Sequence, residues 1–346
     1  MSVKGAMKVH YPAGDSEIRI APGAFDALSV AAERALIVTD DGVPAAYAKK
    51  AAALCRAAHI VTLPAGERSK SMTVLEQLLT LMLEKGFTRG DAVVSVGGGM
   101  VSDIAGLTAA LYMRGVALYH VPTTLLAMAD AAVGGKTAVD LCGVKNAVGS
   151  FYIPKQVVIY PETLKTLPER QYSAGMAEII KIAATSDKQL FSLLEASAPH
   201  DASLTEILFR AVEDKKNVVE KDPQEKGLRR VLNFGHTVGH ALESAMEGKL
   251  LHGECVAAGM LPFAKGEVRE RIRRLLEKYR LPTAIPVGKE ALEPFLLHDK
   301  KAGKEGIVTV EVEEIGSFRF VPRTAEEILA LTDDFRKDRD GKCNLV

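Results

Sequence analysis

The sequence predicts two domains: a doubly wound, mostly parallel α/β domain (Rossmann-like) over residues 1–160 and a mostly α-helical domain over residues 161–346. Before residue 161, short continuous apolar runs alternate with helical stretches, which is the pattern of a parallel sheet covered on both faces. After it, strand-like runs give way to long amphipathic helices. The length of 346 residues also suffices for two separate cores.

The first domain is expected to open with two short strands around a turn, over residues 7–20. Apolar runs then predict core strands at 35–40, 59–63, 92–96, 117–121 and 156–160. Helices are expected at 43–57, at 71–85 and directly after the glycines 97–99. In the second domain we expect a hairpin over 307–321 and helices at 168–184, 187–196, 201–220, 235–246, 253–279 and 324–336.

The composition excludes several classes of protein. The formal net charge is +0, so nothing indicates nucleic acid or an anionic membrane as a partner. No stretch reaches the roughly 18 apolar residues of a membrane span, and the N-terminus lacks a basic-then-apolar leader. The cysteines, Cys55, Cys142, Cys255 and Cys343, are scattered without a CxxC pair. We therefore expect reduced thiols and a cytoplasmic protein.

Three histidines in the second domain indicate a metal site. His236 and His240 are spaced i,i+4, so they share one face of a helix, and His252 follows a plausible helix stop at Gly248. A catalytic metal takes three protein ligands, so another histidine or a carboxylate should complete the set. Glu178, within an apolar stretch, is the candidate carboxylate. Zinc is the first expectation for the ion, and cobalt would suit the same ligands.

A glycine-rich turn indicates a nucleotide site. Residues 97–99 are three glycines between a buried strand and a helix that carries Asp103, so backbone N–H groups can approach a phosphate there. Asp40 ends an earlier strand, where an acidic group can meet a ribose, and Glu67 and Lys70 follow another strand. All belong to the carboxyl edge of the predicted sheet, where open α/β sheets bind ligands.

A set of cationic and amide side chains suits recognition of a phosphate or carboxylate. Its members are Arg114, Lys136, Lys145, Asn146, Lys181, Lys215, Arg229, Asn233 and Lys300. We therefore expect a small anionic substrate.

Ordered motifs between residues 35 and 320 resemble the 3-dehydroquinate synthases, of the sugar-phosphate cyclase group. They are PAGERSK, VGGGMVSDIAG, YMRG, VPTTLLAMADAAVGGKTAV, GMAEIIK, KNVVEKD, GLRRVLNFGHTVGHALE, LHGECVAAGM and HDKK. The resemblance implies Glu178, His236 and His252 as metal ligands, with His240 contacting substrate or relaying protons. It places NAD along Asp40, Glu67, Lys70, Gly98, Gly99, Met100, Asp103, Thr123, Thr124, Lys136 and Lys145. It assigns the substrate to Arg114, Asp130, Lys136, Lys145, Asn146, Lys181, Lys215, Arg229, Asn233, His240 and Lys300.

The implied reaction converts 3-deoxy-D-arabino-heptulosonate 7-phosphate into 3-dehydroquinate and phosphate, in the shikimate pathway of aromatic amino acid biosynthesis. The resemblance implies transient oxidation by NAD, elimination of phosphate, re-reduction and an intramolecular aldol closure. It also suggests a homodimer. The chain departs from the family pattern at Ser102, at Ala131 and Ala132, at Val144 and at 182–183. These departures bear on the shape of the NAD turn and of the Lys145 loop.

Three alternatives remain open on the sequence. A sibling cyclase would act on a related sugar phosphate, and a metal-dependent polyol dehydrogenase would release NADH. A neutral polyol does not require much positive charge in its site. The dehydrogenase is therefore disfavoured by the presence of Lys136, Lys145, Asn146 and Arg229. A non-catalytic NAD-binding module would keep the fold without turnover.

Overall fold

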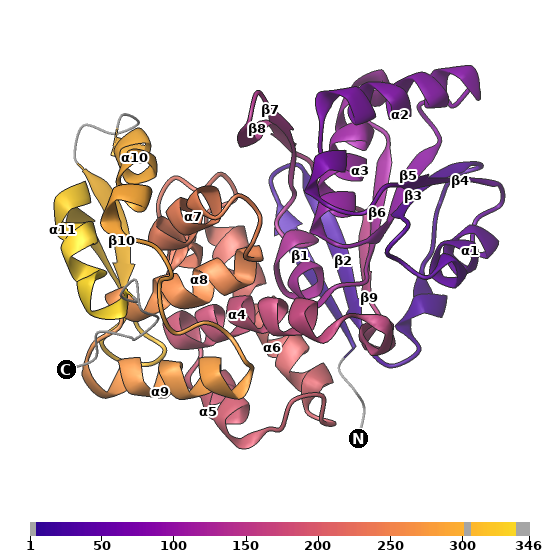
Figure 1. The fold of residues 1–346 in the computed structure, drawn as a ribbon. Coiled ribbons are helices and arrows are strands. Elements are labelled where there is room, and N and C mark those ends of the chain that lie inside the picture. Colours follow the sequence, from indigo (N-terminus) through magenta and orange to yellow (C-terminus); the bar gives the residue numbers. More distant parts are fainter. Residues whose placement is uncertain (1–4, 301–305, 337–346) are drawn as a thin grey trace. The chain divides into compact units, whose positions relative to one another are not determined.

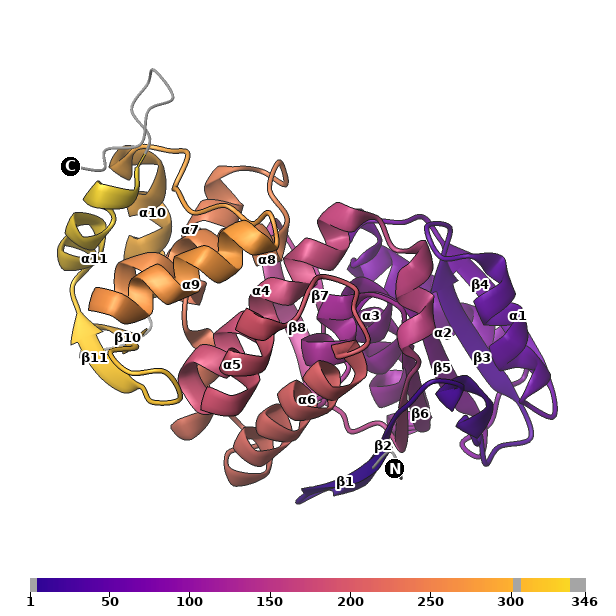
Figure 2. The same ribbon diagram turned by 90° about the horizontal axis from the view of Figure 1, so that it is seen from below.

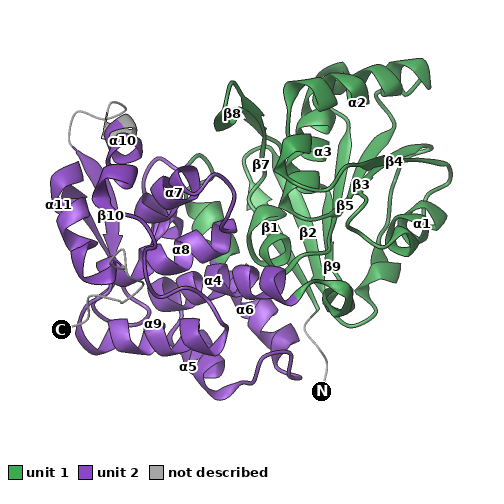
Figure 3. Cartoon of the chain, in the orientation of Figure 1, with its two compact units in different colours: residues 1–168, 215–224 green, residues 169–214, 225–346 purple. Residues whose placement is uncertain are grey.

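The structure, a computed structural model, describes residues 5–300 and 306–336, without the side chains of 298–300. The chain forms two compact units (Figure 3). Unit 1 comprises 1–168 and 215–224, and unit 2 comprises 169–214 and 225–346. This division falls after residue 168 and returns 215–224 to the first unit, whereas the sequence analysis placed one seam after residue 160. The side chains of Lys300 and Cys343 lie outside the described residues, so the structure does not test the roles predicted for them.

Unit 1 contains a seven-stranded sheet of order β1-β2-β9-β6-β5-β3-β4, within the described residues. Only β1 and β2 run antiparallel, and the other neighbours are parallel. The strands are β1 (Ala6–Tyr11), β2 (Gly14–Ile20), β3 (Ala35–Asp40), β4 (Ala58–Leu63), β5 (Ala92–Gly97), β6 (Ala117–Pro122) and β9 (Gln156–Ile159). The predicted doubly wound, mostly parallel sheet is confirmed.

Helices cover both faces of this sheet (Figure 1). Helices α2 (Met72–Glu84) and α3 (Gly99–Leu111) pack on one face, in a core that includes Val93. Helix α1 (Ala45–Ala53) packs on the other face, in a core that includes Val94. Successive side chains of a strand point to opposite faces, so a strand covered on both sides must be apolar throughout. This is why the core strands were visible as continuous apolar runs.

The sequence analysis missed one hairpin of unit 1, formed by β7 (Lys136–Leu141) and β8 (Val144–Phe151). Strand β8 is mostly exposed, so it has no apolar run or clean alternation to reveal it. Its turn uses the left-handed backbone at Cys142 (φ 50°) and Gly143 (φ 78°), as tight hairpin turns require. The hairpin matters because it carries the predicted contacts Lys136, Lys145 and Asn146.

Unit 2 is mainly helical, as predicted (Figure 2). Its helices are α4 (Glu169–Ser186), α5 (Lys188–Ala196), α7 (His236–Ala245), α8 (His252–Met260), α9 (Gly266–Lys278), α10 (Lys289–Lys300), α11 (Ala325–Leu331) and the first part of α6 (Leu204–Lys221). A hairpin joins β10 (Ile307–Glu311) to β11 (Arg319–Arg323). The last turns of α6, from Lys215, belong to unit 1.

One helix prediction in unit 2 was wrong, and one helix was not predicted. The single helix expected over 253–279 is two helices, α8 and α9, separated by a 3-10 turn at Leu261–Phe263. Pro262 lies inside that turn and Gly266 has a left-handed backbone (φ 53°), and both favour a break where the apolar pattern continues. Helix α10 was not expected at all, and Pro294 inside it explains why, since proline weakens a helical signal.

The described cysteines, Cys55, Cys142 and Cys255, form no disulfide. Among the described residues, no helix is both long and apolar enough to cross a membrane.

Helix α6 contains a carboxyl group that is partly buried close to other negative charges. Oδ2 of Asp214 is buried and accepts no hydrogen bond. Burial, with nearby Asp187 and Glu213, raises the pKa of Asp214 to about 7. Asp187 itself accepts hydrogen bonds from the backbone N–H groups of Gln189 and Leu190 at the start of α5, so it stays in place as a second negative charge. Ionised Asp214 therefore destabilises unit 2.

We expect Asp214→Asn to raise the free energy of unfolding at pH 8, by about 1–2 kcal/mol after allowance for partial exposure. The folded state keeps a proton that the unfolded chain releases between pH about 4 and pH about 7, so wild-type stability falls as pH rises through this window. The gain should therefore be smaller at pH 5 than at pH 8. Urea unfolding at both values measures it, with Glu277→Gln, an exposed carboxylate of unit 2, as control. An equal gain at both pH values would contradict the assignment.

Candidate functional site

Four side chains from three helices of unit 2 converge. They are Glu178 on α4, His236 and His240 on α7, and His252 at the start of α8. Ligand atoms of the three histidines lie within 4.8 Å of one another. Glu178 Oε1 lies 3.7 Å from His236 Nε2 and 3.4 Å from His252 Nε2. A tetrahedral ion with bonds of about 2.0–2.1 Å holds its ligand atoms about 3.3–3.4 Å apart, so these spacings fit a divalent metal.

Close backbone packing brings these helices together. A Cβ atom on Gly253 of α8 would lie 1.9 Å from the carbonyl oxygen of Ala174 on α4. A Cβ atom on Gly259 would lie 2.2 Å from the carbonyl oxygen of Gly235, which precedes α7. Figures 1 and 2 both show α4, α7 and α8 side by side. Only glycine permits these contacts, so the metal-binding geometry depends on α8 having no side chain there.

Glu178 is completely buried. Burial alone would raise its pKa, but the positive charge of Lys181, with His236 and His252, holds it well below its ordinary value. Lys181 donates a hydrogen bond to Oε2, while Oε1 accepts none and faces the imidazoles. A buried carboxylate oxygen without a hydrogen bond is costly unless a cation binds it. This supports the fit of a metal ion to the cluster.

The second ring nitrogen of each buried histidine also has a partner. His236 Nδ1 lies 3.2 Å from the carbonyl oxygen of Phe234, and His252 Nδ1 lies 3.1 Å from Glu243 Oε2. Burial and Lys181 hold the pKa of His236 well below its usual range, so this ring is neutral. Burial lowers the pKa of His252, but the negative charges of Glu178 and Glu243 raise it to about 10. The Nε2 atoms of both rings face Glu178 Oε1, at 3.7 Å and 3.4 Å.

The sequence analysis did not select Glu243. It lies three residues after His240 and seven after His236, so the helical period places all three on one face of α7. That period was a usable signal, because a carboxylate on the face of two candidate ligands is a candidate partner of a third.

Three further predicted residues of unit 2 lie close in sequence to the cluster. Lys181 follows Glu178 on α4 and bonds it. Arg229 is buried in the 3-10 turn Leu228–Asn233, which leads into α7. Asn233 donates from Nδ2 to Glu225 Oε1 at 2.9 Å.

In unit 1, Lys70 contacts three other predicted residues. Its buried Nζ lies 2.6 Å from Asp103 Oδ2, 2.5 Å from Asn146 Oδ1 and 3.6 Å from Glu67 Oε1. Burial raises the pKa of Asp103 to about 6, although Lys70 opposes the shift. The contacts join the turn after β4, helix α3 and hairpin β7–β8. Residues from three segments distant in sequence thus form one polar cluster.

The glycine-rich turn connects β5 to α3, as predicted. A Cβ atom on Gly98 would lie 3.0 Å from Thr124 Cγ2, and one on Gly99 would lie 3.3 Å from Ala131 Cβ. Thr123 N donates to Gly97 O at 2.9 Å. The turn and the segment after β6 are therefore adjacent at the carboxyl ends of neighbouring strands, where open α/β sheets bind ligands. Met100 lies in the first turn of α3.

The remaining predicted residues of unit 1 have separate settings. Lys215, buried on α6, bonds the Asp130 carboxylate and lies 2.5 Å from its backbone oxygen. Asp40 ends β3 and accepts from Gly42 N at 2.9 Å, and burial raises its pKa. Arg114 is exposed with a left-handed backbone (φ 67°). Lys136 and Lys145 are exposed on hairpin β7–β8.

Of the sequence departures, Ser102 is buried inside α3 with a hydroxyl that has no hydrogen-bond partner, and the helix continues through it. Ala131 packs beside Gly99, and Val144 begins β8 as an exposed residue.

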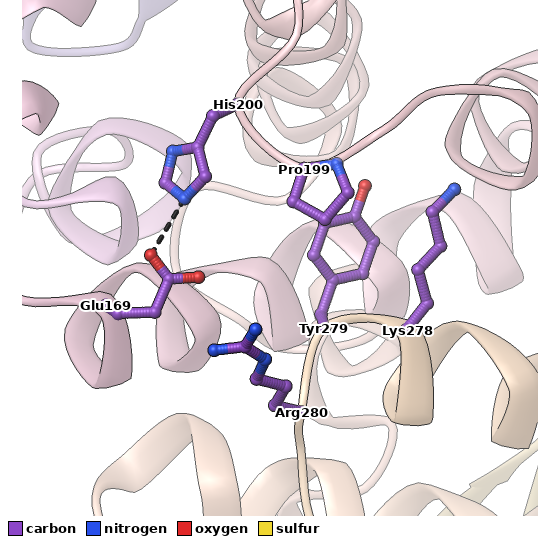
Figure 4. A pocket seen from close by; sticks show the side chains of 6 residues that line it. All are labelled: Glu169, Pro199, His200, Lys278, Tyr279 and Arg280. Atoms are coloured by element: carbon purple, nitrogen blue, oxygen red, sulfur yellow. Dashed lines mark hydrogen bonds and ion pairs between the residues drawn. The ribbon is translucent and has the colours of Figure 1, made fainter.

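A separate cavity of about 380 Å³ lies in unit 2 (Figure 4). It is lined by Glu169, Pro199, His200, Lys278, Tyr279 and Arg280, none of which the sequence analysis selected. His200 Nε2 lies 2.8 Å from Glu169 Oε2, and its ring stacks on Tyr172 at 3.8 Å. These contacts hold the loop after α5 against the start of α4, which is the helix that carries Glu178.

Comparison with known proteins supplies independent findings. The family model described as 3-dehydroquinate synthase N-terminal matches residues 60–174, and the C-terminal model matches 175–302. A 3-dehydroquinate synthase of Symbiobacterium thermophilum is 46% identical, covering 80% of this chain and 82% of that protein. One of Nostoc punctiforme is 37% identical, covering 96% of each.

Solved structures share the fold. The 2-epi-5-epi-valiolone synthase ValA of Streptomyces hygroscopicus, with NAD+ and Zn2+ bound, superposes with a TM-score of 0.82 at 29% identity, covering 96% of this chain and 98% of that one. A 2-deoxy-scyllo-inosose synthase complexed with carbaglucose-6-phosphate, NAD+ and Co2+ gives 0.86 at 24% identity, covering 97% and 100%.

We expect Gly253→Ala to lower the free energy of unfolding by about 1–3 kcal/mol, because the new methyl group must displace α8 from α4. Thermal unfolding measures the loss. Gly90→Ala is the control, since its Cβ would meet nothing closer than 3.8 Å, and it should stay within about 0.5 kcal/mol of wild type. Wild-type stability in Gly253→Ala would show that the close contact is not required.

Proposed function

The chain belongs to the 3-dehydroquinate synthase family, and we propose that it converts 3-deoxy-D-arabino-heptulosonate 7-phosphate into 3-dehydroquinate and phosphate, with NAD and one divalent metal ion. The observation that carries the proposal is the convergence of Glu178, His236, His240 and His252 in a chain that matches both halves of the family. The enzyme is a phosphate-releasing lyase. As the family resemblance suggests, it acts as a homodimer in the cytoplasm.

We assign Glu178, His236 and His252 as the metal ligands, since Glu178 Oε1 faces both Nε2 atoms and lacks another partner. Zinc or cobalt suits this donor set. The ion, when bound, lowers the pKa of a coordinated hydroxyl group. His240 is exposed beside the two ligands, with ring centroids 5.1 Å and 5.7 Å away, and we do not assign it as a ligand. It contacts the substrate or relays protons at the open side of the centre.

The dinucleotide is assigned to the carboxyl edge of the sheet in unit 1. Backbone N–H groups of Gly98, Gly99 and Met100 would receive the pyrophosphate, because they lie at the start of α3, where unpaired N–H groups and the helix dipole favour an anion. Asp40 meets a ribose, and Glu67, Lys70, Asp103, Thr123, Thr124, Lys136 and Lys145 complete the cofactor contacts. NAD supplies transient acceptance of a hydride.

The cationic residues bind and stabilise the anionic substrate. Charged and amide groups hold its carboxylate and phosphate and neutralise the phosphate as it departs. We assign this role to Arg114, Lys136, Lys145, Asn146, Lys181, Lys215, Arg229, Asn233 and Lys300. We assign Asp130, whose carboxylate accepts a hydrogen bond from Lys215, to a hydroxyl group of the substrate, because a carboxylate accepts hydrogen bonds but repels an anion. After elimination, the same contacts orient the flexible product for ring closure.

The direct test is phosphate release from the heptulosonate phosphate with catalytic NAD, before and after chelator treatment, with absorbance at 340 nm followed in parallel. We expect stoichiometric phosphate, no net NADH, and activity that chelation removes and zinc or cobalt restores. Steady NADH from a polyol without phosphate release would instead indicate a dehydrogenase. Turnover of a different sugar phosphate would indicate a sibling cyclase.

His236 and His240 offer a matched pair of variants one helical turn apart. We expect His236→Ala to abolish turnover because it removes a metal ligand. His240→Ala should reduce turnover while the protein retains its metal. Elemental analysis of the purified proteins measures the metal content. Metal loss in His240→Ala with retention in His236→Ala would reverse the assignment of ligands.

A further inference from the structure

We propose that Glu243 is a positioning residue of the metal centre: it accepts a hydrogen bond from His252 Nδ1–H and thereby directs His252 Nε2 at the ion. This inference rests on the metal centre assigned above. Glu243 touches neither the ion nor the substrate in this assignment, and it acts through the imidazole of His252.

The geometry places the ring of His252 between two carboxylates. Its Nδ1 lies 3.1 Å from Glu243 Oε2, and its Nε2 lies 3.4 Å from Glu178 Oε1. A neutral imidazole has one N–H and one lone pair, so the nitrogen that donates decides which nitrogen can ligate. A bound ion displaces one proton of the His252 ring. A carboxylate accepts but cannot donate, so Glu243 keeps the remaining proton on Nδ1 and leaves the lone pair of Nε2 for the ion.

Glu243 holds the ring and does not hold the backbone of His252. The start of α8 is fixed by Glu254, whose Oε2 accepts from Leu251 N at 2.7 Å and whose two oxygens each lie 2.7 Å from Arg170 nitrogens. Gly253 packs against Ala174 at the same place. These contacts hold the start of α8 without Glu243, so we expect loss of Glu243 to act on the freedom and tautomer of the His252 ring.

The two histidine ligands differ in what anchors them. His236 Nδ1 faces a backbone carbonyl, that of Phe234, whereas His252 Nδ1 faces a charged side chain that is only 13% exposed. A carboxylate increases the basicity of the imidazole more than a carbonyl does, so it strengthens the bond from Nε2 to a cation. The face of α7 thus supplies the ligand His236, the exposed His240 and the group that orients the third ligand.

The test compares Glu243→Gln with wild type and with Glu247→Gln, an exposed carboxylate beyond the end of α7. Metal-free proteins are titrated with Zn2+ in competition with a chromophoric chelator. We expect Glu243→Gln to weaken zinc binding by about 10- to 100-fold, with an unchanged unfolding midpoint of the metal-free protein, and Glu247→Gln to bind like wild type. NMR of the zinc-loaded wild type should show a downfield, slowly exchanging Nδ1–H of His252 that is lost in Glu243→Gln.

Equal zinc affinity in wild type and Glu243→Gln overturns the inference, as does equal weakening in Glu247→Gln, which would report only general charge. Glu243→Asp, which retains the charge on a shorter side chain, is the second variant and should bind with intermediate affinity. Wild-type affinity in Glu243→Asp with no NMR change in either variant also overturns it. If wild type binds no zinc, the proposed metal centre fails together with this inference. If wild type binds and the variants match it, only the role of Glu243 fails.

Discussion

The proposed metal centre depends on a contact between backbones. Helix α8 crosses α4 and the start of α7 at Gly253 and Gly259, where any Cβ atom would overlap a carbonyl oxygen. Helices that meet through ordinary side chains have axes 8–10 Å apart, and glycines permit a closer approach. Because α8 lies so close, the short reach of Glu178 and of the imidazoles is enough to bring their ligand atoms to the spacing of a tetrahedral ion.

Buried charge is the second constraint. Lys70, Lys181 and Lys215 are all buried, and each bonds a carboxylate that the sequence also marked as a site residue. A lone buried ammonium group is unfavourable by several kcal/mol, and removal of one partner of such a pair costs about 3–5 kcal/mol. Substitution at these positions therefore changes stability as well as binding. The two effects must be separated whenever such variants are assayed.

The sequence predicted what is periodic or locally patterned. The core strands, the glycine turn and the i,i+4 histidines were all visible, because burial on two faces, backbone approach and helix geometry each leave a local mark. Hairpin β7–β8 was not, because β8 is exposed and lacks a hydrophobic pattern. The join between α8 and α9 was hidden by an apolar pattern that continues through Pro262. The helical spacing placed Glu243 on the face of His236 and His240, but it could not identify the partner, because His252 lies on another helix.

The sequence separation of the metal ligands has a consequence for folding. His236 and His252 lie on consecutive helices that pack together, so their contact is local and closes a short loop. Glu178 comes from a helix far upstream and must be brought in by a non-local contact, which is slower to form. The complete ligand set therefore exists only once α4 has docked. If the proposed ligands bind an ion, that ion selects the native state and stabilises unit 2 by mass action, and metal supply during synthesis then becomes a determinant of folding yield.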